Sequence, residues 1–143
     1  MKLLELILGA MLTLAGGVGA LLLTKLFVDP LNEQKKVIAE ITSSLFYWAR
    51  IYVNPIVPRS KSPDIIKAEV ELRALAGKLI AATAGVRPYR LALWLGAPSP
   101  VGIDEAAGHF IAISNCIDDP TAGAKNYERA NSTLARLRIN AKI

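Results

Sequence analysis

The feature that most constrains this chain is an uncharged run over residues 6–24, LILGAMLTLAGGVGALLLT. Its 19 positions hold 13 apolar residues, four glycines and two threonines. A helix of this length rises about 28 Å, which is close to the ~30 Å hydrocarbon core of a bilayer. Leu26, Phe27 and Val28 extend the run, and the Lys25 side chain can reach the headgroups. Residues 1–28 are therefore predicted to be a membrane anchor, with the span over about residues 6–27.

A cleaved signal peptide is the competing interpretation of the same run. Residues 18–20 (VGA) form a small-residue pattern of the kind that a signal peptidase accepts. Three leucines follow at once, however, and the run is longer than an ordinary signal-peptide core. An uncleaved anchor is the favoured prediction.

Lysines on the two sides of the span predict its orientation. Lys2 precedes the span, whereas Lys25, Lys35 and Lys36 lie in the flanking window after it. Because the more positive flank stays in the cytoplasm, residues 29–143 are predicted to be a cytoplasmic domain of a single-pass protein of the inner (cell) membrane. Cys116 is the single cysteine, and a thiol that cannot pair within the chain suits a reducing compartment.

Small residues recur inside the span. Gly9, Thr13 and Gly17 are spaced by four, so they share one helix face. Such spacing lets two helix backbones approach closely in lipid, which predicts a helix-association face for a second copy or for another protein. Glycine is also frequent in membrane helices in general, and this interpretation stays open beside the first.

Proline-containing turns divide the remaining 115 positions into helical segments. Asp29 is predicted to cap the first helix, with Pro30 in its first turn, and Ser62 and Ser99 stand in the same relation to the prolines that follow them. The predicted helices cover residues 31–54, 63–85, 87–95, 100–117 and a last segment that includes 127–141. Residues 55–63, between the first two, form a proline-rich linker.

Apolar residues in these helices recur at intervals of three and four. The rows are Leu31, Ile38, Ile41, Leu45, Trp48 and Tyr52; Ala68, Leu72, Leu75, Leu79 and Ala82; Ile103, Ala106, Phe110, Ile113 and Ile117; and Tyr127, Ala130, Leu134, Leu137 and Ala141. No segment alternates with the period of two that marks a strand. The predicted fold class is all-α, with an N-terminal transmembrane helix followed by a small antiparallel helical bundle.

Metal and catalytic chemistry have few candidates. Glu105, His109 and Cys116 lie within ~40° of one another around one helix and are zinc-ligand types, so they are weak metal candidates. The edge of the core is the favoured interpretation of all three. Because neither a glycine-rich phosphate loop nor a paired-cysteine motif is present, no cofactor and no catalytic residue is assigned, and the protein is predicted not to be an enzyme.

Basic residues are the other candidates for binding. Residues 29–143 hold 15 Lys plus Arg against 11 Asp plus Glu, a net charge of +4. Arg129 and Arg136 lie seven apart on one predicted helix, and with Lys142 they form a possible anionic-lipid face. A solvated basic surface is the favoured interpretation. Nucleic acid is an unlikely partner, because no nucleic-acid-binding motif is present.

Two short polar or aromatic stretches remain. Phe46 and Tyr47 point away from the apolar row of their helix and are candidates to meet another helix, such as the one carrying Trp94. Ser114 and Asn115 follow the core face near a helix end. They could be a recognition patch or a local cap, and the cap is favoured.

Four stretches carry a resemblance to known proteins: residues 37–55 (VIAEITSSLFYWARIYVNP), 75–79 (LAGKL), 95–99 (LGAPS) and 110–115 (FIAISN). They resemble a loose group of small, uncharacterised bacterial proteins with one N-terminal membrane span and a helical cytoplasmic domain. Trp48 and Arg50 depart from the tyrosine-alanine-asparagine form of that group, whose alanine is matched by Ala49. The resemblance implies architecture and topology, and it assigns no activity.

The sequence thus leads to two hypotheses about function. The first is a membrane-anchored helical interaction module without catalytic activity, whose partners are the lipid bilayer and a protein bound through the domain or the span. The alternative is a self-associating membrane-active protein, holin-like or toxin-like, which assembles through the small-residue face.

Overall fold

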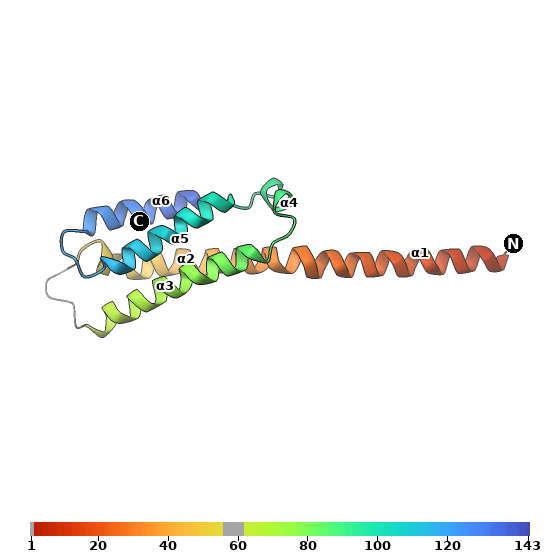
Figure 1. Cartoon of the computed structure of the whole chain (residues 1–143), viewed down its shortest axis with the longest axis horizontal. Helices are drawn as coiled ribbons and strands as arrows, with labels where there is room; N and C mark the ends of the chain where they lie inside the picture. Colours follow the sequence, from red (N-terminus) through yellow and green to blue (C-terminus); the bar gives the residue numbers. More distant parts are fainter. Residues whose placement is uncertain (1, 56–61) are drawn as a thin grey trace.

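The computed structural model describes residues 2–55 and 62–143, and the side chains of these residues except 2–10 and 12. The described part of the chain is helical and contains no strand. One long helix forms a stalk that enters the bundle, and the other helices pack alongside its far half (Figure 1). The predicted all-α class, with an apolar N-terminal helix before a bundle, is confirmed.

The stalk and the first helix of the bundle are continuous. α1 (Lys2–Leu23), a π-helical turn η1 (Thr24–Val28) and α2 (Asp29–Tyr52) follow one another without a break (Figure 1). Within the described residues, Thr13–Tyr52 is the one helix long and apolar enough to cross a membrane, and it lies near the N-terminus.

The expected N-cap at Asp29 is wrong. Asp29 has helical dihedrals, its N–H bonds to the carbonyl oxygen of Thr24, and its side chain pairs with Lys25 at 3.0 Å. Pro30 lacks an N–H, and its ring would crowd the carbonyl group four residues earlier in a regular helix. The wider π turn lies directly before this proline, which is how the helix passes through it.

The remaining helices fold back along α2. α3 (Pro63–Ala84) and α5 (Pro100–Asn115) pack against each other, α2 packs on α3, and α6 (Gly123–Arg136) packs on α5 and α2. The predicted starts of α3 and α5 are confirmed. The Ser99 hydroxyl accepts from Gly102 N at 3.0 Å as an N-cap, whereas Ser62 occupies the N-cap position of α3 without a side-chain cap bond. Residues 56–61, most of the expected linker, lie outside the described residues.

The core follows the predicted apolar rows with a few shifts. In α2 the face includes Val37 and Ile51, while Ile38 lies at its edge. In α6 the expected Tyr127 is exposed, and Asn126 before it is fully buried. The largest fully buried side chains include Trp48, Tyr52, Phe110, Ile41, Leu45, Leu72, Leu79, Ile103, Ile113 and Leu134.

The last helix ends earlier than its apolar row suggested. Ile139 N bonds to Leu134 O at 2.8 Å, and Arg138 N bonds to Ala135 O at 3.0 Å. Arg138 has φ of 60°, so these bonds form a Schellman-type end with an arginine in the left-handed position. The tail then folds back on α6, where Ile143 N bonds to Asn131 Oδ1 at 3.1 Å.

A short helix, α4 (Tyr89–Trp94), closes the end of the bundle next to the stalk (Figure 1). It begins two residues later than predicted and ends just before the predicted Gly96, whose φ of 90° suits glycine. Ala97 N bonds back to Ala92 O at 2.9 Å. The buried side of this segment packs on Phe27 and Leu31 of the long helix, which forms a second small core.

Candidate functional site

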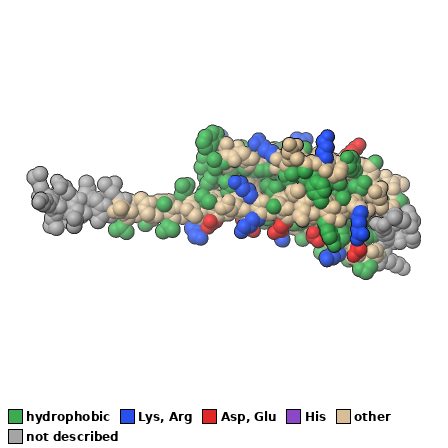
Figure 2. Space-filling view, turned by 180° about the vertical axis from the view of Figure 1, so that it is seen from behind, with side chains coloured by type: hydrophobic (Ala, Val, Ile, Leu, Met, Phe, Trp, Pro, Cys, Tyr) green, Lys and Arg blue, Asp and Glu red, His purple; other side chains and the backbone are tan. Residues whose placement is uncertain are grey.

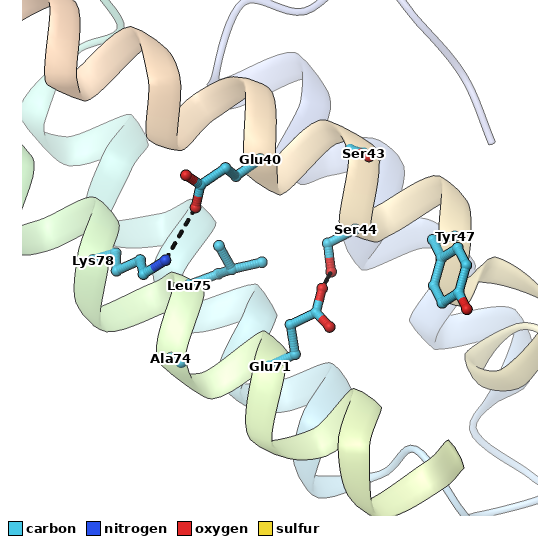
Figure 3. Close-up of a pocket in the computed structure, with 8 residues that line it drawn as sticks. All are labelled: Glu40, Ser43, Ser44, Tyr47, Glu71, Ala74, Leu75 and Lys78. Atoms are coloured by element: carbon cyan, nitrogen blue, oxygen red, sulfur yellow. Dashed lines mark hydrogen bonds and ion pairs between the residues drawn. The ribbon is translucent and has the colours of Figure 1, made fainter.

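An open groove of about 470 Å³ lies between α2 and α3 (Figure 3). We call it the α2–α3 groove. Its lining residues are Glu40, Ser43, Ser44 and Tyr47 from α2 and Glu71, Ala74, Leu75 and Lys78 from α3. Each set has the spacing i, i+3, i+4 and i+7, so each is one continuous face of its helix. The groove therefore arises from two polar faces that meet beside the core.

Two hydrogen-bonded pairs join the walls of the groove. Ser44 Oγ donates to Glu71 Oε1 at 2.8 Å, and Lys78 Nζ lies 3.1 Å from Glu40 Oε2 (Figure 3). Ser44 is buried, whereas the Glu40 and Lys78 side chains are more than half exposed. An exposed pair of this kind contributes little to stability, so its charges are available to a bound molecule.

An aromatic edge borders the groove. Tyr47 is 65% exposed, and its ring lies edge-on to Trp48, with the ring centroids 4.6 Å apart. The expected contact of Phe46 and Tyr47 with α4 is wrong, because α4 packs near Leu31, about 24 Å along the helix axis from Tyr47. Tyr47 lies beside α3 instead. The groove thus combines an exposed tyrosine, two carboxylates and the apolar Leu75 side chain.

The three weak metal candidates do not come together as a ligand set. Glu105 pairs with Arg136, with Nε and Oε2 2.6 Å apart. His109 Nδ1 lies 3.5 Å from the Thr133 hydroxyl, and Cys116 is half-buried at the end of α5. No group of three or more His, Cys, Asp or Glu residues in the described part of the chain is placed to hold a metal ion.

His109 should make stability depend on pH. Burial lowers the pKa of the imidazole, Glu105 opposes this effect, and Arg129 and Arg136 reinforce it. A base whose pKa is lower in the folded state than in the unfolded state loses folding stability as the pH falls below its unfolded value of about 6.5. We expect the urea midpoint of the full chain in detergent to fall on acidification from about pH 7.5 to about pH 5.5.

The variant His109→Gln isolates this effect. It keeps a polar side chain near Thr133 but cannot titrate, so its urea midpoint should fall less than that of the unchanged protein over the same pH interval. An equal fall in both proteins would show that other groups carry the pH dependence.

The possible lipid face on α6 has internal partners. Arg129 Nη1 donates to Asn126 Oδ1 at 3.0 Å and to Ala112 O at 3.5 Å, while Arg136 is held by Glu105. Lys142 is exposed on the C-terminal tail. Two of the three cations thus stabilise the α5–α6 contact, and lipid binding by this set stays a prediction.

The small-residue face of the span is described only in part. The surroundings of Gly9 lie outside the described residues. Thr13 and Gly17 lie on the exposed stalk, and a Cβ atom added at Gly17 would meet nothing within 4 Å. Helix association through this face stays a prediction.

Ser114 and Asn115, expected to be a local cap or a recognition patch, lie at the end of α5 and contact α3. Ser114 is buried and its hydroxyl donates to Ile111 O, while Arg73 of α3 donates to Ser114 Oγ at 3.2 Å and to Asn115 Oδ1 at 2.7 Å. Arg73 also pairs with Glu69 at 2.9 Å. The pair therefore fastens α5 to α3.

The α2–α3 groove is not among the sites predicted from the sequence. Glu71, Ala74, Leu75 and Lys78 share one helix face in the sequence, but the same spacing is found on any solvent-exposed helix face. A groove wall and a solvent-exposed face can be told apart only once α3 is known to pack on α2.

Comparison with protein-family models, curated proteins and solved structures finds no match for this chain. The fold itself defines the class: an all-helical bundle that continues directly from one long apolar helix near the N-terminus.

Proposed function

We propose that this is a single-pass membrane protein whose helical bundle is a non-catalytic interaction module on the cytoplasmic face of the inner (cell) membrane. The module binds a protein partner in the α2–α3 groove. The paired charges and the aromatic edge of the groove are the features that support a binding role.

One observation carries this proposal: the apolar helix continues into α2 without a linker. A flexible tether would let a domain sample many orientations. A continuous helix instead holds the groove at a set height, with Tyr47 about 28 Å beyond Val28 along the axis. Such a module presents one face to partners that are themselves confined to the membrane, which raises their effective concentration.

The groove chemistry defines the partner surface. Glu71 and Glu40 offer carboxylate oxygens, and Tyr47 and Leu75 offer apolar area. A partner segment with a lysine or arginine next to an apolar side chain would replace the exposed Glu40–Lys78 pair and cover the tyrosine ring.

Photocrosslinking in cells tests the proposal. A photoreactive phenylalanine analogue in place of Tyr47 should give one defined heteromeric product. The same analogue in place of Tyr127, which is also exposed but lies on α6, should not give that product. The substitution Glu71→Lys should abolish the product by reversing the charge in the groove, while circular dichroism verifies that the bundle is still helical.

Each outcome separates the hypotheses. Equal products from positions 47 and 127, or none from position 47, would contradict a partner site in the groove. Homomultimers that form through the stalk would favour the alternative, a self-associating holin-like or toxin-like protein. The open surroundings of Gly16, Gly17 and Gly19 on the stalk are the observation that favours this alternative.

A further inference from the structure

We propose that the segment over residues 86–97, which contains α4 and is here called the α4 cap, docks on the headgroup region of the bilayer that α1 spans. This inference rests on the proposed membrane placement of α1. It adds a second attachment point, on the bundle itself, to a protein whose first attachment is the span.

The first argument is the height of the cap. Its buried residues Val86, Ala92 and Ala97 pack on Phe27 and Leu31 of the long helix. Phe27 ends the predicted span, and Leu31 lies only about 6 Å further along the axis. The headgroup layer is ~5–8 Å thick on each side, so the cap lies level with it.

The second argument is the exposed face of the cap. Trp94 is 81% exposed, and Leu91, Leu93 and Leu95 around it are also exposed. Figure 2 shows hydrophobic side chains gathered at the corner of the bundle where the stalk enters. Tryptophan and leucine on a short amphipathic helix are typical of segments that lie in the interface, since the indole ring favours the boundary between lipid and water.

The third argument is charge. Arg87 and Arg90 are exposed on the cap, and no acidic residue lies between Glu71 and Asp104 in the sequence. Cations next to exposed apolar side chains complement a leaflet that contains anionic lipid, and arginine can reach phosphate while its stem stays in the apolar layer.

The fourth argument is that the cap is held in place. The Tyr89 hydroxyl donates to Pro98 O at 2.9 Å and accepts from Gln34 Nε2 at 3.0 Å. Gln34 is buried in α2 and also donates to Thr83 Oγ1 at the end of α3 at 2.9 Å. These bonds hold the cap to α2 directly and, through Gln34, to the end of α3. Seating the cap on lipid would therefore also fix the tilt of the bundle and the direction in which the α2–α3 groove faces.

Tryptophan quenching by lipid tests the docking. The full chain, reconstituted in phosphatidylcholine–phosphatidylglycerol vesicles with acyl chains brominated near the headgroup, contains two tryptophans, Trp48 and Trp94. Trp48 is buried and about 30 Å beyond Val28 along the helix. We expect the bromine atoms to quench the emission of Trp94 and to leave the emission of Trp48 unchanged. The variant Trp94→Phe, which keeps only Trp48, should therefore show no quenching.

A matched control places an exposed tryptophan away from the membrane. Tyr47→Trp in the Trp94→Phe background should stay unquenched. If vesicle flotation shows the protein inserted but Trp94 is unquenched, the docking of the cap is overturned while the membrane placement stands. If the protein does not float with the vesicles, the membrane placement is overturned and the docking with it.

Discussion

The substitution Phe110→Ala is expected to lower the free energy of unfolding by about 3–5 kcal/mol. Phe110 is fully buried in α5, the helix that packs on both α3 and α6. Alanine would remove most of the aromatic ring and leave a cavity that close-packed neighbours fill only in part. Because domains are stable by only about 5–15 kcal/mol, this loss is a large part of the total.

The measurement is urea unfolding of the full chain in detergent, followed by circular dichroism. Ile111→Ala is the matched control, because Ile111 is the next residue of the same helix and is 44% exposed. Its truncation should shift the urea midpoint only slightly. Equal shifts for the two variants would contradict the placement of Phe110 at the centre of the core.

Local chemistry explains why most helix boundaries were predictable. A serine before a proline marks the starts of α3 and α5, and Gly96 marks the end of α4, because glycine readily adopts the positive φ found there. Each signal acts within a few residues and does not depend on the rest of the fold. Arg138 has no such signal, since arginine rarely adopts a left-handed conformation, and so the end of α6 was placed too late.

Contacts between distant segments explain what the sequence did not reveal. Asn126 is fully buried because its amide donates to the carbonyl oxygens of Tyr52 and Cys116, at 3.3 and 3.2 Å. In the sequence it is a polar residue next to an aromatic one, and periodicity favoured Tyr127 as the core residue. Its amide nitrogen is buried against carbonyl oxygens 74 and 10 positions away, which no local pattern specifies.

The candidate site shows the same limit. The residues of each wall of the α2–α3 groove can be assigned to one helix face from the sequence, but Ser44 and Glu71 meet only because α3 returns antiparallel to α2.

The exposed face of the α4 cap could not be predicted from the sequence either. A run of leucines around Trp94 suggests a buried helix, and only the packing of its other side on Phe27 leaves this face open beside the stalk.

The substitution Gly123→Ala is expected to destabilise the bundle by about 1–3 kcal/mol. A Cβ atom at Gly123 would overlap the carbonyl oxygen of Val53 and lie 3.3 Å from Pro55 Cδ. The first of these is a backbone atom at the end of α2, which cannot rotate away as a side chain can. The start of α6 would have to move outward, and the hydrogen bond from Asn126 to Tyr52 O would lengthen with it.

A second glycine supplies the control with the opposite sign. Gly108 lies exposed inside α5, and a Cβ atom there would meet nothing within 4 Å. Alanine is favoured over glycine in a helix interior by about 1 kcal/mol, so Gly108→Ala should raise the urea midpoint while Gly123→Ala lowers it. If both variants raised the midpoint, helix propensity alone would govern these positions. The close approach of α6 to the end of α2 would then be wrong, because it is this contact that requires a residue without a side chain at Gly123.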